Sequence, residues 1–168
     1  MLKKVCGFLS TILLIVLAAI AISLFVPRLL GYETMAVVSG SMEPGIPVGS
    51  VVYVKKDISP EDLKVKDVVT YQLGGNTRVT HRIAGIDAAT GNYITKGDAN
   101  DTEDAEPVTF AQIVGKMAFS IPLLGYISIY IKTPLGIAAV AAVVFILLLL
   151  MFLPDIFTKE TKHKEKSK

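Results

Sequence analysis

Ser39-Gly40-Ser41-Met42-Glu43-Pro44 is the stretch around which this chain is organised, and it joins an apolar run at residues 35–38 to another at residues 51–54. Two hydroxyl side chains flank a glycine, and the proline stops any helix from passing through. A serine on such open backbone is accessible enough to act as a nucleophile. The same residue types also gather in turns for conformational reasons alone. By itself the hexapeptide favours a simple turn, so the rest of the chain has to decide between the two interpretations.

Two long uncharged runs flank the middle of the chain, one of 22 residues at positions 5–26 and one of 19 residues at positions 135–153. They explain why 52% of the residues are hydrophobic. Each run is long enough to cross about 30 Å of hydrocarbon as a helix. We therefore expect an N-terminal stub and transmembrane anchor at 1–30, an external domain at 31–133, a C-terminal transmembrane helix at 134–153 and a cytoplasmic lysine-rich tail at 154–168.

The charges beside the two runs predict their orientation. Lys3 and Lys4 precede the first run, and five lysines follow the second. Lysine collects on the cytoplasmic side of membrane helices, which puts both ends in the cytoplasm and the middle block outside. A cleavable signal peptide is the alternative for the first run. That run is longer than the usual apolar segment, and residues 25–28 lack a small-x-small cleavage pattern, so we interpret it as a retained anchor.

The middle block, residues 31–133, is large enough for one small domain. It carries 12 acidic and 9 basic residues, so it offers no basic surface for nucleic acid. Cys6 is the only cysteine and lies in the first apolar run, which excludes a disulfide within the chain. The only histidines are His81 and His163, and we expect neither a metal site nor a cofactor.

The middle block consists of short strand-like runs separated by turns, which predicts a mainly β domain. Runs that predict strands lie at residues 51–54, 68–73, 77–86, 93–95 and 113–118. In the third of these, the alternate residues Val79, His81 and Ile83 fall on one face. The domain is thus expected to be built from antiparallel strands, with the serine loop leading into the first of them.

Three other segments of the middle block carry local signals. Gly74-Gly75-Asn76 is the turn expected between the second and third runs. Residues 60–63, which follow Ser59, predict only a short helical turn. Residues 121–127 are apolar, and the sequence leaves open whether they form a core strand or rest on the membrane surface.

Serine catalysis needs a base beside the hydroxyl, and the middle block holds one histidine, His81. A neutral imidazole accepts the proton of a serine and passes it to a leaving amine. A carboxylate best orients such an imidazole, and acidic residues gather at positions 97–104. Each feature has a structural alternative: a hydrogen-bonded strand histidine and a solvated acidic loop. Together with Ser41 they favour Ser/His catalysis, although sequence spacing does not show that they meet.

Three short stretches together resemble the signature boxes of the type I signal peptidases: residues 39–44, residues 81–83 (His-Arg-Ile) and residues 96–100 (Lys-Gly-Asp-Ala-Asn). Their order and spacing are similar to the branch found in archaea, the endoplasmic reticulum and some Gram-positive bacteria. A lysine holds the base position in the main bacterial branch, whereas this chain has His81 there. The resemblance extends from the first apolar run to about Tyr126. It implies a coiled β-sheet catalytic domain, flanked by transmembrane helices, with a groove for an extended peptide.

The same resemblance implies roles for individual residues. Ser41 is implied as the nucleophile and His81 as its base. Asp104 is implied as the third catalytic acid, although the family often has paired acids there and Asp104 matches only the second. Asp98 is implied as a supporting carboxylate, and the sequence leaves open which acid orients His81. Ser39 matches the position whose hydroxyl helps to form an oxyanion hole beside the Ser41 backbone N–H.

The resemblance also implies an activity: a membrane-bound serine endopeptidase that cleaves N-terminal signal peptides from secreted preproteins after a small-x-small motif. The expected partners are these preproteins, the lipid bilayer and subunits of the secretion machinery. The expected location is the cell membrane, or the endoplasmic reticulum membrane in a eukaryote, as a multi-pass protein with an extracytoplasmic catalytic domain. Two alternatives stay open: a dedicated processing peptidase for a few secreted structural proteins, and a non-catalytic membrane-anchored assembly protein with the same β-domain.

Overall fold

The computed structural model describes residues 2–75 and 77–165 of the chain. The helices are α1 (Leu2–Leu29), α2 (Leu124–Tyr130), α3 (Pro134–Glu165) and the 3-10 turns η1 (Pro60–Asp62) and η2 (Phe110–Gln112). The strands are β1 (Tyr32–Ala36), β2 (Val51–Lys55), β3 (Val68–Gln72), β4 (Arg78–Ile86), β5 (Tyr93–Lys96) and β6 (Ile113–Ile121). Asn76 of the predicted turn and residues 166–168 of the predicted tail lie outside the described residues.

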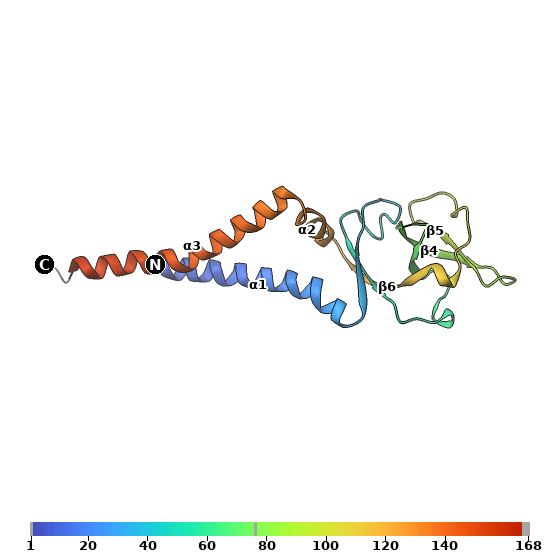
Figure 1. Ribbon diagram of the computed structural model, residues 1–168, viewed down its shortest axis with the longest axis horizontal. Helices are drawn as coiled ribbons and strands as arrows, with labels where there is room; N and C mark the ends of the chain where they lie inside the picture. The colour runs from blue at the N-terminus through green and yellow to red at the C-terminus, as the bar shows by residue number, and fades with distance from the viewer. Residues whose placement is uncertain (1, 76, 166–168) are drawn as a thin grey trace. The chain divides into compact units, whose positions relative to one another are not determined.

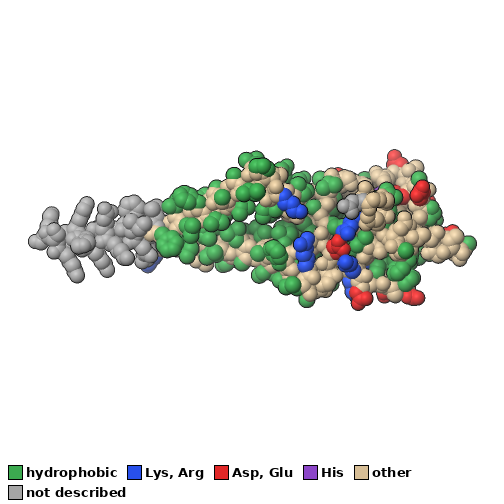
Figure 2. All heavy atoms as spheres, in the orientation of Figure 1, with side chains coloured by type: hydrophobic (Ala, Val, Ile, Leu, Met, Phe, Trp, Pro, Cys, Tyr) green, Lys and Arg blue, Asp and Glu red, His purple; other side chains and the backbone are tan. Residues whose placement is uncertain are grey.

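The chain divides into two compact units, one of residues 24–129 and one that holds most of α1 together with α3. The stretches Lys4–Leu29 and Pro134–Phe152 have mean hydropathies of 2.8 and 3.0, and hydrophobic side chains cover them (Figure 2). Almost none of either stretch is buried inside the protein, unlike the core helix of a soluble protein. Both are therefore long and apolar enough to cross a membrane.

The unit of residues 24–129 is built on one sheet whose described strands follow the order β1-β2-β6-β3-β4-β5. Figure 1 labels β4, β5 and β6 of this sheet. All of the strand pairs are antiparallel. Bulges interrupt the register between β2 and β6, between β3 and β6, and between β4 and β5. A bulge increases the local twist of a strand, which is how a sheet of this kind coils. The predicted mainly β fold with apolar helices at both ends is confirmed.

Each of the five predicted strand runs forms a strand, and the short turn predicted after Ser59 is η1. The strand interpretation of residues 121–127 is wrong. β6 ends at Ile121, Leu123 adopts a positive φ of 65°, and α2 begins at Leu124. A positive φ leaves the extended region of backbone space, so the strand cannot continue through Leu123. The membrane-surface interpretation of this segment stays a prediction.

Two hydrophobic clusters support the parts of the sheet that carry the predicted site residues. One lies beneath β3, β4 and β5 and is made of Leu63, Val69, Tyr71, Ile83, Tyr93 and Val108. The other joins the serine loop to β2 and β3 and is made of Met42, Ile46, Val52, Val54 and Val68. The serine loop and the histidine strand are thus each fixed by a core of their own, and neither depends on local propensity alone.

Candidate active site

The serine loop is held in place by the buried side chains of Met42 and Ile46. Met42 and Ile46 are 2% and 3% exposed, and the Ile46 N–H donates to the Met42 carbonyl at 2.8 Å. Burying two large apolar side chains fixes the loop backbone more firmly than its Ser and Gly residues could. Ser41 stays partly exposed at the rim, and its Oγ lies 3.4 Å from Ser39 Oγ. The loop therefore presents two neighbouring hydroxyl groups on a rigid base.

His81 lies on β4, where the strand alternation turns its side chain inward beside the core. Its Nδ1 is 2.7 Å from Asp104 Oδ2, and the imidazole is largely buried. An ionised carboxylate can only accept hydrogen bonds, so Nδ1 is the donor in this pair. In a neutral imidazole that donates from Nδ1, Nε2 is unprotonated and is the atom that accepts a proton from a serine.

The Asp104 carboxylate is ionised more readily than an ordinary aspartate. Burial opposes the charge, but hydrogen bonds from His81, Thr95 and Tyr71 outweigh it and lower the pKa of Asp104. Thr95 Oγ1 donates to Oδ2 at 2.6 Å and Tyr71 OH at 2.9 Å. Burial raises the pKa of Tyr71 to about 12, so the phenol keeps the proton that it donates. Asp104 thus faces His81 as an anion whose Oδ2 accepts three hydrogen bonds.

Asp98 is held by arginine and does not contact the imidazole. Arg82 Nε donates to Asp98 Oδ1 at 2.8 Å and Arg82 Nη2 donates to Oδ2 at 2.6 Å, a bidentate pair. The same guanidinium donates to the Lys66 carbonyl at 2.8 Å. The hydrogen bond from Arg82 lowers the pKa of Asp98. Of the two predicted acids, Asp104 is the one that meets His81, and Asp98 holds the loop in which it lies.

The Asp98 loop also reaches the backbone of Ser41. The Ala99 N–H donates to the Ser41 carbonyl at 2.9 Å. A Cβ added to Gly97 would lie 2.6 Å from that carbonyl oxygen, so a larger residue at Gly97 would push the two segments apart. The Arg82–Asp98 pair therefore helps to hold the serine backbone in position from a distance.

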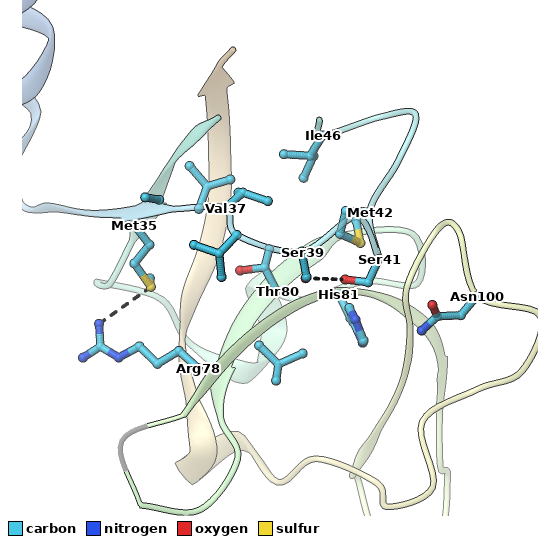
Figure 3. Close-up of a pocket in the computed structure, with 14 residues that line it drawn as sticks. Met35, Val37, Ser39, Ser41, Met42, Ile46, Arg78, Thr80, His81 and Asn100 are labelled. Carbon is cyan, nitrogen blue, oxygen red and sulfur yellow. Dashed lines mark hydrogen bonds between the residues drawn. The ribbon is translucent and has the colours of Figure 1, made fainter. Parts of the chain in front are cut away.

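Ser39, Ser41 and His81 line one groove of about 500 Å³. Figure 3 shows these residues near the end that Asn100 occupies, with Met35 and Arg78 at the other end. The remaining wall is mostly apolar and includes Val37, Val38, Met42, Ile46, Val52 and Val79. Among the described residues, no hydrogen bond joins Ser41 to His81, and no three His, Cys, Asp or Glu side chains form a group that could hold a metal ion. Catalytic serine–histidine bonds are often long in the absence of substrate.

Four residues of this region were not predicted as site residues: Tyr71, Thr95, Arg82 and Asn100. Tyrosine and threonine are common in β-strands, so the presence of Tyr71 and Thr95 in two predicted strands did not indicate a role in the site. Arg82 and Asn100 lie inside the boxes that resemble the signal peptidases, so their positions were visible in the sequence, although their contacts were not.

We expect the free energy of unfolding to fall in acid because of Asp98. The folded-state pKa of Asp98 is lowered, so its contribution is present above the unfolded pKa of about 3.9 and is lost as the pH falls through the folded value. Asp98→Asn should cost only about 1 kcal/mol near neutrality, because Arg82 is 39% exposed and solvent screens the pair. Melting of the detergent-solubilised full chain between pH 3 and pH 7, about one unit below to three above that pKa, would measure both effects.

The variant should lose less stability on acidification than the parent protein does. Asp101→Asn is the matched control, because the structure gives the Asp101 carboxylate no hydrogen bond among the described residues. An acid dependence that is the same for parent and Asp98→Asn would contradict the assignment of the Arg82–Asp98 pair.

Comparison with known proteins gives relatives of one kind. No family model matches the chain. It is 41% identical over 86 residues to signal peptidase I W of Bacillus subtilis, covering 49% of this chain and 45% of that protein. It is 30% identical over 111 residues to the signal peptidase complex catalytic subunit SEC11 of Colletotrichum graminicola, and 31% identical over 111 residues to that of Sclerotinia sclerotiorum. Both fungal alignments cover 58% of this chain and 63% of the relative.

The chain therefore spans about half of the Bacillus protein and somewhat less than two thirds of the fungal ones. The names of these relatives agree with the family that the three boxes resemble. They confirm the predicted resemblance: the chain is similar to proteins named as signal peptidase I and as catalytic subunits of the signal peptidase complex.

Proposed function

We propose that this chain is a membrane-bound serine endopeptidase that cleaves N-terminal signal peptides from secretory preproteins after a small-x-small motif. One observation supports the proposal above the others. Ser41, His81 and Asp104 are far apart in the sequence, yet the first two line one groove and the third holds the imidazole. The relatives' names point to the same activity.

In the proposed reaction, Ser41 Oγ attacks the carbonyl carbon of the scissile peptide while His81 Nε2 takes its proton. The C–N bond then breaks, and the imidazolium gives the proton to the leaving amine. This leaves an acyl-enzyme on Ser41. Water attacks the acyl carbon by the same route, with His81 again as base, and returns Ser41 to its free form. Asp104 keeps Nδ1 protonated and stabilises the positive imidazolium at each step.

The oxyanion of the tetrahedral intermediate needs donors at the rim of the groove. We propose that the Ser41 backbone N–H and the Ser39 hydroxyl supply them. Ser39 Oγ lies 3.4 Å from Ser41 Oγ, within reach of an oxygen attached to the carbon that Ser41 attacks. Such donors stabilise charge that develops only in the transition state, so they raise kcat more than they tighten substrate binding.

The groove predicts a preference for small residues one and three positions before the cut. An extended peptide points alternate side chains toward the same wall, so both positions meet the same apolar surface. Leucine at either position should lower kcat/KM by about tenfold or more relative to alanine, because a bounded pocket cannot accept the added volume. Leucine two positions before the cut is the control and should be tolerated. Equal rates for alanine and leucine at the first and third positions would contradict the proposed mode of binding.

We also propose the location and the partners. α1 and α3 would anchor the protein in the cell membrane, or in the endoplasmic reticulum membrane of a eukaryote, with residues 31–133 outside the cytoplasm. The hydropathy of both helices and the lysines beside the apolar runs support this arrangement. The fungal relatives are named as catalytic subunits of a complex, so subunits of the secretion machinery join preproteins and the bilayer as proposed partners.

The direct test uses the detergent-solubilised full chain and a secretory preprotein with an Ala-x-Ala site. We expect one new N-terminus directly after that site, read by mass spectrometry, and no product with Ser41→Ala. A folded parent protein that leaves the preprotein intact would favour the non-catalytic assembly alternative. Equal cleavage by the parent and by Ser41→Ala would show that another protease is responsible.

A further inference from the structure

Three hydrogen bonds converge on a single oxygen of the carboxylate beside His81. Asp104 Oδ2 accepts from His81 Nδ1 at 2.7 Å, from Thr95 Oγ1 at 2.6 Å and from Tyr71 OH at 2.9 Å. Hydrogen bonds to an ionised oxygen are about twice as strong as neutral ones. The hydrogen bonds from Tyr71 and Thr95 therefore stabilise one position of Asp104 Oδ2 relative to other rotamers of Asp104 and to positions in which water would be its partner.

The donors come from three adjacent strands, whereas the acceptor comes from a loop. Tyr71 lies on β3, His81 on β4 and Thr95 on β5, and these strands are neighbours in the sheet. Asp104 lies between β5 and η2 in a segment without regular structure, tied to the sheet by its N–H bond to the Thr95 carbonyl at 2.8 Å. A loop side chain has several rotamers available, so a rigid sheet must select the one that meets His81.

Burial makes this selection effective. Thr95 is fully buried and Tyr71 is 2% exposed, while part of the Asp104 side chain still reaches solvent. A buried hydroxyl without an acceptor would destabilise the fold. The fold is therefore more stable when both hydroxyls donate to Asp104 Oδ2. A purely structural core would need neither hydroxyl, since phenylalanine and valine fill nearly the same volumes.

We propose that Tyr71 and Thr95 are positioning residues that act through Asp104 to keep His81 oriented as a base. The inference rests on the proposed function for its kinetic consequence, but its structural content can be measured without any substrate. Ser41 and His81 line the groove, whereas Tyr71 and Thr95 are not among its lining residues. Their effect on the reaction is therefore indirect and should leave substrate binding unchanged.

The kinetic test compares Thr95→Val, Thr95→Ser and Tyr71→Phe in the full chain. Losing one hydrogen bond to a charged group should lower kcat about tenfold in Thr95→Val and in Tyr71→Phe, with KM unchanged. Thr95→Ser restores the hydroxyl and should recover most of the lost kcat. Tyr93→Phe is the matched control: Tyr93 is 3% exposed in the same cluster, and its hydroxyl makes no bond to Asp104.

The second readout is the proton resonance of His81 Nδ1–H in histidine-labelled protein. The chain has only one other histidine, so His163→Gln leaves a single imidazole to observe. The far-downfield signal of a proton shared with a carboxylate should move upfield or broaden in Thr95→Val and Tyr71→Phe. It should be unchanged in Tyr93→Phe and nearly restored in Thr95→Ser.

The two readouts separate the two hypotheses. If the parent protein cleaves no preprotein but its Nδ1 signal responds to Thr95 and Tyr71 as described, the proposed function fails and the positioning role stands. If kcat and the Nδ1 signal of Thr95→Val and Tyr71→Phe both match those of the parent, the positioning role is overturned. Should Thr95→Val lower the melting temperature too far to be studied, Tyr71→Phe and Thr95→Ser decide by the same criteria.

Discussion

His81→Ala should lower kcat for preprotein cleavage by about 10⁴-fold or more, because the serine then has no base within the groove. His81 is the only histidine of the middle block, and its imidazole lines the groove with Ser41. The variant should keep its fold, since the core beneath β4 is made mainly by Ile83 and its neighbours. Single-turnover cleavage with excess enzyme, together with a melting curve, would measure the two properties separately.

Lysine is the rival base, since it holds this role in the main bacterial branch. Lys56 pairs with Glu33 at 3.4 Å, and Lys96 Nζ donates to the Asp101 carbonyl at 3.3 Å. Neither of them, nor Lys55, is among the residues that line the groove. Lys55→Ala and Lys56→Ala are therefore the matched controls and should keep most of the activity. Near-normal turnover by His81→Ala would mean that the proposed mechanism is wrong.

Asp104→Asn should lower kcat by about 10²–10³-fold, through loss of charge more than loss of geometry. Thr95 and Tyr71 both donate to the site of Oδ2, so the amide oxygen of the asparagine should occupy it and its NH₂ group should point away. The imidazole would then keep its tautomer. It would lose the anion that stabilises the imidazolium formed during proton transfer.

A melting curve distinguishes this loss from a folding defect, since the variant should stay folded at the temperature of the assay. Asp98→Asn is the matched control, because Asp98 pairs with Arg82 and not with His81. It should lose much less kcat than Asp104→Asn does. Equal losses of kcat in the two variants would contradict the assignment of Asp104 as the acid that serves His81.

The strands were predictable where a local pattern was strong. Residues 68–73 and 77–86 are rich in β-branched residues, and β3 and β4 form there. Val68 to Tyr71 of β3 are buried, whereas β4 buries only His81 and Ile83. β1 was not predicted, because Tyr-Glu-Thr-Met-Ala has neither a sustained apolar run nor a clean alternation. It forms at the edge of the sheet through its pairing with β2 and through ion pairs of Glu33 with Lys56 and Arg78.

α2 was missed for a different reason. Its seven residues follow a strand directly and are apolar, and a run this short has the composition of a strand and of a helix alike. Backbone contacts decided the outcome: the Gly125 N–H donates to the Gly49 carbonyl at 2.8 Å, and no larger residue would fit there, because a Cβ on Gly125 would lie 2.5 Å from the Ser50 carbonyl oxygen. This close approach involves a segment more than seventy positions away in the sequence, which no local pattern reports.

By itself the sequence determined the properties that belong to single segments: two runs apolar enough to cross a membrane, the strand runs of one small β domain, and a serine, a histidine and acidic residues in three short boxes. Only the tertiary structure decided that Asp104 meets His81 while Asp98 pairs with Arg82, and that Tyr71 and Thr95 share the Asp104 oxygen. The physical reason is that side chains distant in the chain meet through strand register and bulges. A shift of one residue would turn each of them to the opposite face of the sheet.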